Sequence, residues 1–516
     1  ELTIEGTGAM YDYSNSTAAP WQSYAGSIKS VVIKTGVTGI GSWAFSQCAV
    51  LTDVSIAESV IRIGGDAFRE CSTLEEITLP KGLTELGTGV FLYCSALKSV
   101  TVPEGVTKIG SDTFEFCPQL ASITFPSGLT EIGAWALKGA YNLTSITCKA
   151  ATPPSLEREV FSGVNTETPI YVPASSVEAY KTAYGWNQFA NIQPIILASG
   201  TCGDDLAWKL TDEGELTIEG TGAMTDYEPH SAPWFAYKDE IKTVTIKPGV
   251  TTIGKYAIGD CSNLTTVTIP EGVTSIGLQA FQYCYKLTSV TLSDGLKTID
   301  WGAFAECHEL PSIDIPEGVT TIGNYAFTHC YKLSSVTIPE SVTSIGIYAF
   351  RNTAITSVMI PANISSLSQG TFENCPNLSS ITCKAETPPS VGHSETFYNV
   401  NRSIPVYVPV SAIDAYKEAD YWKEFTYFLP MGTCGDNLTW VLTDEGELIV
   451  EGTGDMYDYE PQTAPAPWNA YRELIMTVTL SEVVASIGDY AFRGCCLTDI
   501  TIPKNSKLTS IGNGAF

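Results

Sequence analysis

Short runs of alternating apolar and polar residues return at a regular spacing through most of this chain. In one of them, Val267 and Ile269 are apolar, while Thr268 between them is polar. That alternation predicts a short strand whose apolar side chains point to one side. A proline–glycine turn follows, and the apolar positions between residues 273 and 284 lead the chain back through a helical or irregular turn.

The same pattern recurs at steps of about 23 residues, and a fixed period of this length is typical of a solenoid. One coil cannot cover its own apolar side, whereas coils stacked at the ~4.8 Å spacing of paired strands cover it for one another. Each fully buried Val, Ile or Phe then contributes about 1.5–3 kcal/mol to folding. The predicted coils begin at Ile28, Leu51, Leu74, Leu97, Leu120, Leu143, Ile241, Leu264, Leu287, Leu310, Leu333, Ile355, Leu378, Ile475 and Leu497.

A larger repeat surrounds the coils. The segment ELTIEGTGAMYDY at Glu1 recurs in close form from Glu215 and Glu447, and the later two follow CGDDLAWKLTDEG and CGDNLTWVLTDEG. We call the residues that precede each set of coils an opening segment. Alternation in the second one predicts a β-hairpin with inward Leu206, Trp208, Leu210, Leu216 and Ile218.

Another pattern, YVP…AY…W, follows the coils. It occurs twice, and the two copies end at Trp186 and Trp422. Because solenoid ends expose apolar surface, we expect these segments to be closing caps.

These patterns divide the chain into three modules, each an opening segment, a solenoid and a cap, with the third incomplete. The expected parts are a truncated β opening segment at 1–27, a solenoid at 28–165, a closing cap and linker at 166–201, a β opening segment at 202–240, a solenoid at 241–400, a cap and linker at 401–433, a β opening segment at 434–474 and truncated repeats at 475–516. The first opening segment lacks its front half and the last coil is cut, so we expect a piece of a longer protein. A missing signal or anchor then says nothing about localisation.

The coil sequence resembles a known family. LTSVTLSDGLKTIDWGAFAEC and its siblings are similar to the BspA-like leucine-rich repeats of bacterial and protozoan surface proteins, also called the Treponema pallidum type. The resemblance implies an α+β repeat solenoid with short strands, here flanked by β-hairpin opening segments and atypical caps. Members of the family are secreted or surface-attached, and some act as adhesins for host matrix proteins or other bacteria. A shared scaffold does not fix the ligand.

Composition narrows the classes of partner. The chain has 516 residues, 44% of them hydrophobic, which supports an ordered core. Its 28 basic and 56 acidic residues give a net charge of −28, and this charge opposes binding to nucleic-acid phosphates or anionic lipids. No run approaches the roughly 18 apolar residues of a membrane span.

Most of the 15 cysteines occupy one repeat position, so one thiol per coil falls in a stacked row. Parallel side chains in such a row keep their Cβ atoms at the coil spacing, longer than the ~3.8 Å that a disulfide prefers. No CxxC or Cys/His cluster offers a tetrahedral metal site. We therefore favour buried structural thiols over disulfides or metal at Cys48, Cys71, Cys94, Cys117, Cys261, Cys284, Cys307, Cys330 and Cys375.

Other candidate chemistry has a simpler interpretation. The EGTG segments lack the glycines and lysine of a phosphate loop and read as turns that end strands. A row of acidic residues at the proline–glycine turn could bridge calcium, but no coil supplies a full set of oxygen ligands, so we expect solvated turns at Glu271, Asp294, Glu317 and Glu340. The four histidines do not recur at a fixed place in the large repeat, and no nucleophile–base set is found. We predict no enzyme activity and no cofactor.

Aromatic residues outside the apolar pattern are the best candidates for ligand contact. They follow the inward cysteines or stand just before them in successive coils, at Tyr283, Tyr285, His308, His329 and Tyr331, with a weaker version at Tyr93 and Phe116. Stacking would gather them into a stripe, and exposed aromatic side chains supply rigid area for binding. The alternative is that they only cover the cysteine row. A row of outward threonines along the strands is a rival surface.

The sequence thus predicts a non-catalytic extracellular or cell-surface protein that mediates adhesion or protein recognition, with a host or bacterial surface or matrix protein as partner. A glycan-binding module is the second hypothesis, and the tyrosine stripe would favour it. A structural surface stalk is the third.

Overall fold

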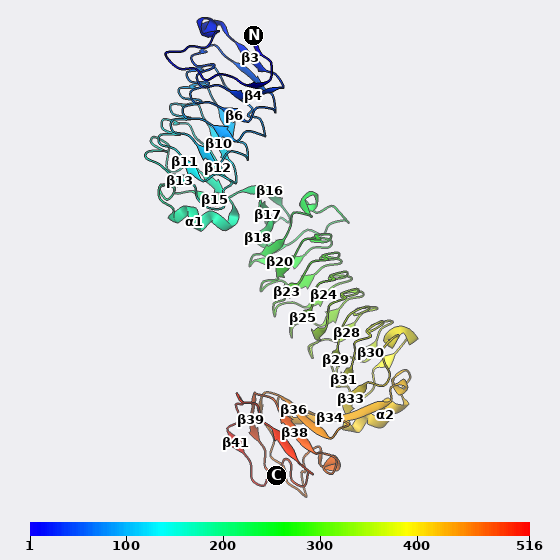
Figure 1. Cartoon of the computed structure of the whole chain (residues 1–516). Helices are drawn as coiled ribbons and strands as arrows, with labels where there is room; N and C mark the ends of the chain where they lie inside the picture. The colour runs from blue at the N-terminus through cyan, green and yellow to red at the C-terminus, as the bar shows by residue number, and fades with distance from the viewer. The chain divides into compact units, whose positions relative to one another are not determined.

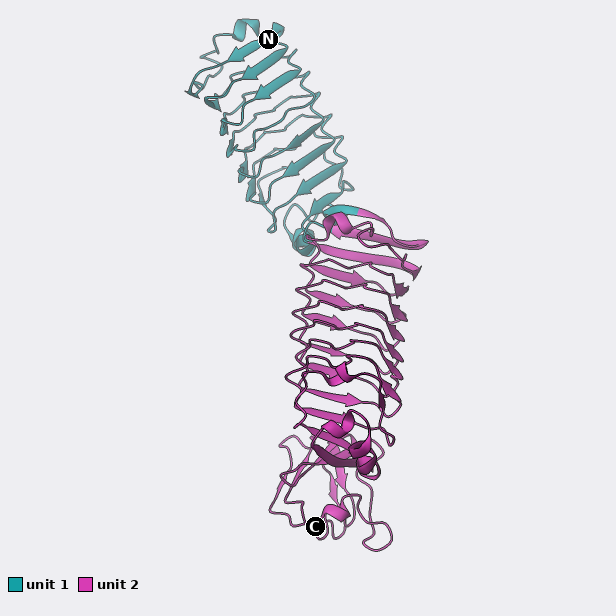
Figure 2. Ribbon diagram, turned by 90° about the vertical axis from the view of Figure 1, so that its right-hand side faces the viewer, with its two compact units in different colours: residues 1–198, 211–213 teal, residues 199–210, 214–516 magenta.

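The computed structural model describes every residue from Glu1 to Phe516 and divides into two compact units (Figure 2). Unit 1 comprises residues 1–198 and 211–213, and unit 2 comprises residues 199–210 and 214–516. Each unit consists of stacked coils (Figure 1), so the predicted solenoid of about 23 residues per coil is confirmed. We call the coils of unit 1 the first solenoid and the coils over residues 241–400 the second solenoid.

Two rows of parallel strands run along unit 1, and most coils contribute one strand to each row. The first row contains β1 (Leu2–Ile4), β3 (Ser30–Ile33), β5 (Asp53–Ile56), β8 (Ser99–Thr101), β10 (Ser122–Phe125), β12 (Ser145–Cys148), β14 (Ile170–Val172) and β15 (Ile192–Pro194). The second row contains β2 (Gly8–Ala9), β4 (Val37–Ile40), β6 (Arg62–Ile63), β7 (Glu85–Leu86), β9 (Lys108–Ile109), β11 (Glu131–Ile132) and β13 (Ser155–Leu156).

Unit 2 repeats this plan. Its first row contains β19 (Thr243–Ile246), β21 (Thr266–Thr268), β23 (Ser289–Thr291), β25 (Ser312–Asp314), β27 (Ser335–Thr337), β29 (Ser357–Ile360), β31 (Ser380–Cys383) and β33 (Pro405–Pro409). The second row contains β20 (Val250–Ile253), β22 (Ser275–Ile276), β24 (Thr298–Ile299), β26 (Thr321–Ile322), β28 (Ser344–Ile345), β30 (Ser366–Leu367) and β32 (Ser390–Val391). The pairing is in register, with Val267 of β21 between Val244 and Val290.

The hairpin predicted from alternation in the second opening segment is present in unit 2. Strand β17 (Asp205–Thr211) pairs antiparallel with β18 (Glu215–Ala223), and Trp208 lies opposite Ile218. Strand β18 then pairs in parallel with both β19 and β20, so this hairpin starts both strand rows. A further strand, β16, covers Ile196–Thr201.

The third opening segment continues directly from the second solenoid. Strand β34 (Tyr427–Gly435) pairs in parallel with β33 and antiparallel with β35 (Leu438–Leu442). One eight-stranded sheet therefore runs from β29 to β40, and residues 429–433, expected to be a linker, lie within β34. The remaining strands of this region are β36 (Glu447–Gly452), β37 (Gly454–Asp455), β38 (Thr477–Leu480), β39 (Val484–Ile487), β40 (Asp499–Thr501) and β41 (Ser510–Ile511).

Helices are few and short. The two α-helices, α1 (Val177–Thr182) and α2 (Ile413–Glu418), both lie in the expected closing caps, where Tyr180 and Tyr416 are fully buried. The 3₁₀ turns are η1 (Gln22–Ser27), η2 (Ala174–Ser176), η3 (Phe235–Tyr237), η4 (Ser394–Phe397), η5 (Val410–Ala412), η6 (Trp422–Glu424) and η7 (Asn469–Tyr471). No helix has the length and apolar character needed to cross a membrane.

A ladder of stacked phenylalanines forms the centre of each solenoid. In unit 2, Phe304 is fully buried between Phe281 and Phe327, with ring centroids 5.2 and 5.6 Å away. Phe91 of unit 1 lies in the same way between Phe68 and Phe114. Because the rings belong to successive coils, each coil completes the core of its neighbour.

The cysteine row is buried, as predicted, and it also makes hydrogen bonds. The Sγ of Cys307 donates to the carbonyl oxygen of Phe281 at 3.4 Å, and Cys330 donates to Phe304 at 3.2 Å. Cys71, Cys94, Cys117, Cys284 and Cys375 bond in the same way to the residue 25 or 26 positions earlier. Burial raises the pKa of these thiols, to about 12 for Cys94 and Cys330. A small apolar side chain that can donate to a loop carbonyl explains why cysteine suits this position.

Candidate ligand-binding surface

The loop that closes each coil holds two residues in the left-handed backbone region, two positions before and two positions after the core phenylalanine. We call the surface formed by these loops the turn face. Beside Phe281 the two residues are Gln279 and Tyr283, with φ of 52° and 62°. In other coils the second position is Gly139 or Asn374, which adopt this conformation readily, whereas a bulky residue there is uncommon. The repeat therefore fixes the left-handed backbone of the loop, but it does not require an aromatic residue at that position.

Five predicted site residues of the second solenoid lie together on the turn face. We call Tyr283, Tyr285, His308, His329 and Tyr331 the aromatic stripe. Tyr285 and Tyr331 are 40% and 53% exposed, and His308 lies between them with its ring centroid 4.8 and 4.9 Å from theirs. Tyr283 and His329 extend the contacts at 5.9 and 5.7 Å. The structure thus connects these five side chains through ring contacts between successive members.

A carboxylate that the sequence analysis did not single out holds the two histidines. Glu306 Oε2 lies 2.9 Å from His308 Nε2, and Glu306 Oε1 lies 2.6 Å from His329 Nδ1. An ionised carboxylate only accepts hydrogen bonds, so both ring nitrogens donate to it. Glu306 occupies the same coil position as Tyr283 and His329, and comparing that position coil by coil would have identified it.

Ring orientation decides what the aromatic stripe presents to solvent. Tyr285, His308 and Tyr331 succeed one another along the stack with interplanar angles of 44° and 46°. At centroid separations below 5 Å, neighbouring rings cover part of each other's faces. Because successive rings are tilted against one another, the row does not form one flat aromatic platform.

The remaining two predicted site residues form a separate pair in unit 1. Tyr93 and Phe116 stack nearly parallel, with centroids 5.2 Å apart and an interplanar angle of 5°. Cations lie over both rings, because Arg69 is 6.0 Å from the Tyr93 centroid and Lys138 is 5.4 Å from that of Phe116. This pair therefore differs from the aromatic stripe in having cations over its rings, while Tyr93 itself is 41% exposed.

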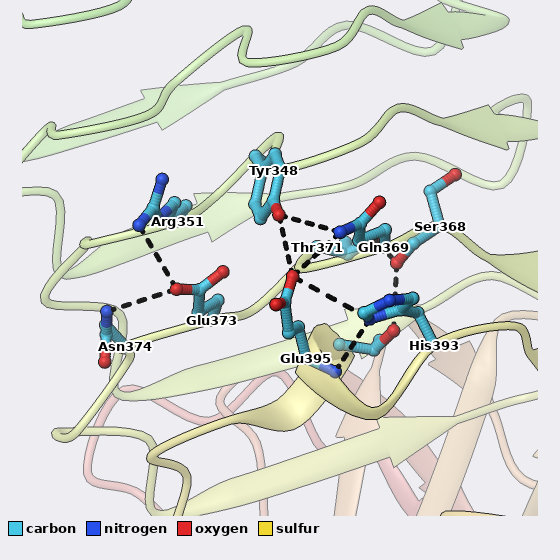
Figure 3. Close-up of polar contacts among 10 residues, drawn as sticks. Tyr348, Arg351, Ser368, Gln369, Thr371, Glu373, Asn374, His393 and Glu395 are labelled. Atoms are coloured by element: carbon cyan, nitrogen blue, oxygen red, sulfur yellow. Dashed lines mark hydrogen bonds and ion pairs between the residues drawn. The ribbon is translucent and has the colours of Figure 1, made fainter.

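A polar cluster continues the turn face of the second solenoid beyond the aromatic stripe (Figure 3). Tyr348 Oη donates to Glu395 Oε2 at 2.7 Å, and Gln369 Nε2 donates to both groups at 2.9 and 2.8 Å. The hydrogen bond to Glu395, together with burial, raises the pKa of Tyr348 to about 12, and the donors from Gln369 and Tyr348 lower the pKa of Glu395. His393 Nδ1 lies 3.7 Å from the same carboxylate oxygen.

An ion pair borders this polar cluster. Arg351 NH2 lies 3.2 Å from Glu373 Oε1, and Asn374 Nδ2 donates to the same oxygen at 3.5 Å (Figure 3). Glu373 is only 7% exposed. The Arg351–Glu373 ion pair and the Tyr348–Glu395 hydrogen bond each link different coils. The cluster therefore serves to join coils in the structure, and sequence analysis missed it because its members belong to different coil positions.

Two other surfaces were considered from the sequence, the acidic turns and the threonine row. The acidic residues of the proline–glycine turns are exposed, and Glu340 pairs with Lys384 at 2.5 Å. No three His, Cys, Asp or Glu side chains converge to hold a metal ion anywhere in the described chain, residues 1–516. The threonine row lies along the strands, with Thr268 paired between Thr245 and Thr291.

Comparison with known proteins assigns the repeat. The family model for the BspA type leucine rich repeat region matches six copies, over residues 22–144, 91–196, 231–320, 302–414 and 470–516. No curated protein matches the chain.

Three solved structures illustrate the similarity. A leucine rich cell surface protein from Faecalibacterium prausnitzii is 23% identical over 63% of this chain and 80% of its own, with a TM-score of 0.30. A leucine-rich repeat protein from Eubacterium ventriosum is 24% identical over 69% and 90%, with a TM-score of 0.28. A Treponema pallidum leucine rich repeat protein is 27% identical over 42% and 89%, with a TM-score of 0.27. Because these TM-scores are low, the assignment rests on the family model. The chain belongs to the BspA type leucine-rich repeat family.

Proposed function

We propose that this protein is a non-catalytic secreted or cell-surface protein that mediates adhesion by recognising another protein through the aromatic stripe of the second solenoid. A repeat scaffold of the BspA type is consistent with recognition and adhesion. Solenoids bind partners along their extended faces. The partner would be a host or bacterial surface or matrix protein.

The observation that carries the proposal is the exposed ring row of Tyr285, His308 and Tyr331. Aromatic side chains are enriched among the residues that dominate protein–protein binding, because they supply large rigid area. Tyr283 and His329 support it further. Both lie in the left-handed region at φ of 62° and 59°, although glycine or asparagine would fit that backbone more easily. Their aromatic side chains thus stand at positions where the coil itself does not call for them.

Orientation of the rings favours a protein partner over a glycan. Sugars stack on open aromatic faces, while protein partners also use ring edges and hydroxyl hydrogen bonds. The stripe offers no continuous flat face, because its rings are tilted against one another. Glycan binding remains the second candidate because Tyr331, at the end of the row, contacts rings only at His308 and His329. Its outer face is followed by Ala354 at the equivalent position of the next coil.

The test is a paired screen of this protein against extracellular-matrix proteins and a glycan array. The same screen is run with the stripe variant Tyr285→Ala, His308→Ala, Tyr331→Ala. A matched control removes three exposed tyrosines elsewhere, Tyr141→Ala, Tyr184→Ala and Tyr398→Ala, which are 59%, 85% and 61% exposed. Circular dichroism and thermal unfolding establish that all three proteins are folded.

The proposal predicts a protein ligand whose affinity falls by about tenfold or more in the stripe variant, as expected for loss of binding residues worth about 2 kcal/mol. The control variant should bind like the parent. Equal binding by the parent and the stripe variant would place recognition elsewhere. A hit restricted to glycans would support the second candidate, and no hit in either library would favour a structural stalk.

A further inference from the structure

A groove of about 630 Å³ lies in unit 2 where the closing cap of the second solenoid meets the third opening segment. One wall is the start of helix α2 and the first part of strand β34. The other wall is the turn between β35 and β36 and the segment that leads into β38. The lining residues used below are Val410, Asp414, Lys417, Asp444, Glu445, Glu473, Leu474 and Met476.

Apolar side chains on this groove are unusually exposed. Leu474 is 61% exposed, Met476 is 46% exposed and Val410 is 39% exposed. The backbone around them is fixed, because Met476 N donates to the carbonyl oxygen of Gly446 at 2.8 Å. A cluster of exposed apolar side chains on an ordered surface is typical of an interaction site.

Carboxylates surround these apolar residues. Asp414, Asp444, Glu445 and Glu473 line the groove against the single cation Lys417. None of the four forms an ion pair in the described chain, residues 1–516, so their charge is uncompensated. The neighbouring Tyr407 responds to this field: burial raises its pKa, and the carboxylates of Asp444 and Glu445 raise it further. The groove therefore combines exposed apolar side chains, which we call its apolar floor, with four carboxylates, which we call its rim.

The other two opening segments lack this apolar floor. Aligned on the Tyr-x-x-x-Ile stretch that leads from each of them into the coils, Leu474 corresponds to Ser27 and Glu240. Met476 corresponds to Lys29 and Lys242. The repeat itself therefore tolerates polar residues at both places. Leucine and methionine in the third module are not needed to form it.

The connection into the third opening segment is also shorter. From the cap tryptophan to the cysteine that begins the next module, the first connection runs from 186 to 202 and the second from 422 to 434, so the second has four residues fewer. As a result β34 serves both the cap and the opening segment, pairing with β33 and β35. Strand β34 on one wall of the groove, and strands β35 and β36, whose turn lies on the other wall, therefore belong to one continuous sheet.

We propose that this junction groove binds a polypeptide segment that carries positively charged and apolar side chains. The volume lies within the range of about 300–1,000 Å³ common for binding sites. Apolar side chains of the partner would cover Leu474 and Met476, and its cations would meet the four carboxylates. A second copy of this chain fits poorly, because its own net charge is −28. The groove is separate from the aromatic stripe and does not depend on the function proposed for it.

The experiment measures binding of a fluorescein-labelled peptide of alternating lysine and leucine by fluorescence anisotropy, using the whole chain. Matched probes alternate glutamate with leucine and lysine with serine. The first variant, Leu474→Glu with Met476→Lys, installs the residues of the second opening segment and leaves the net charge unchanged. The second, Asp444→Asn with Glu445→Gln, removes rim charge only. A charge control, Glu271→Gln with Glu317→Gln, removes two exposed carboxylates elsewhere in unit 2.

We expect the lysine–leucine probe to bind the parent, and both groove variants to weaken it about fivefold or more. The charge control should change its affinity less than about twofold. The other two probes should bind weakly, since each lacks one half of the required chemistry. Failure of the parent to bind, or unchanged binding by the Leu474→Glu, Met476→Lys variant, would overturn the proposal. So would equal weakening by the charge control, which would indicate general attraction to an acidic protein.

Sedimentation of the parent and of the Leu474→Glu, Met476→Lys variant tests whether a second copy of this chain occupies the groove instead. The proposal expects both to be monomeric at the concentrations used for binding. Self-association of the parent that the variant abolishes would show that a second copy fills the groove, and would overturn the assignment to a basic partner.

Discussion

The two solenoids share one core and differ on the turn face. In both, phenylalanines stack through the centre and cysteine thiols donate to loop carbonyls. On the turn face, however, the position directly after the cysteine is small or proline in the first solenoid, whereas three successive coils of the second solenoid hold Tyr285, His308 and Tyr331 there. The difference shows that the repeat specifies the coil and leaves this position free for another role.

An ion pair between neighbouring coils also differs between the two solenoids, because the acidic and the basic residue have exchanged places. In the first solenoid, Glu115 and Lys138 directly follow the apolar core residue of successive coils, and their charged atoms lie 2.8 Å apart. In the second solenoid, the same two positions hold Arg351 and Glu373, at 3.2 Å. The carboxylate side chains are 12% and 10% exposed. Pairing between coils is thus kept, while the sign at each place is reversed.

The largest predicted effect concerns what the solenoids share. Phe304→Ala in the second and Phe91→Ala in the first should each lower the free energy of unfolding by about 3–5 kcal/mol, because each leaves a cavity in a fully buried ladder. Urea denaturation measures the loss, and hydrogen exchange locates it in the altered coil and its neighbours. An effect within about 0.5 kcal/mol, as for a surface substitution, would contradict the stacked core.

The reversed ion pair provides the next test. Arg351→Ala should lower the free energy of unfolding by about 1–3 kcal/mol, because it leaves the buried Glu373 without its cation. Exchanging the charges, Arg351→Glu with Glu373→Arg, should recover most of the loss seen for Arg351→Glu alone, since the first solenoid carries that arrangement. Thermal unfolding of the parent, of Arg351→Glu, of Glu373→Arg and of the exchanged double variant measures the coupling. Additive losses would show that the two side chains do not interact.

A smaller effect distinguishes the polar cluster of the second solenoid. Tyr348 donates to Glu395, and its pKa is raised to about 12. A raised pKa in the folded state means that this contribution to stability is present below the ordinary tyrosine pKa of about 10 and is lost as pH rises toward 12. In the first solenoid, Glu159 corresponds to Glu395 and accepts a hydrogen bond from Trp135 Nε1 at 3.2 Å. An indole group does not ionise in this pH range, so this hydrogen bond adds no comparable loss of stability at high pH.

The measurement for this cluster is the difference in tyrosinate absorbance between the parent and Tyr348→Phe during an alkaline titration. The missing step should lie near pH 12, and Glu395→Gln should move it to lower pH. A step at the ordinary tyrosine pKa in the parent would contradict the hydrogen bond.

Periodicity in the sequence was sufficient to predict the buried half of the molecule. Inward positions such as Val267 and Cys307 recur because burial imposes one residue type per place, and the structure has both buried. The hairpin through Trp208 followed from the same logic. The exterior aromatic residues could be placed on one side of the stack for the same reason.

The contacts of outward residues could not be predicted from that pattern. Glu306 reaches both His308 and His329 only because of side-chain rotamers and the left-handed loop. The sequence predicts a cap and linker over residues 401–433, whereas residues 427–435 form strand β34, whose pairing with β33 and β35 depends on distant residues. Long-range pairing of this kind is absent from any local window of sequence.

The central claim is that recognition belongs to the aromatic stripe and not to the frame that all coils share. The most direct test titrates one captured protein ligand against the Tyr285→Ala, His308→Ala, Tyr331→Ala variant and against Tyr93→Ala, Phe116→Ala, by biolayer interferometry. The account predicts an affinity loss of about tenfold or more in the first variant and less than about twofold in the second. Equal losses, or a loss only in the second variant, would contradict it.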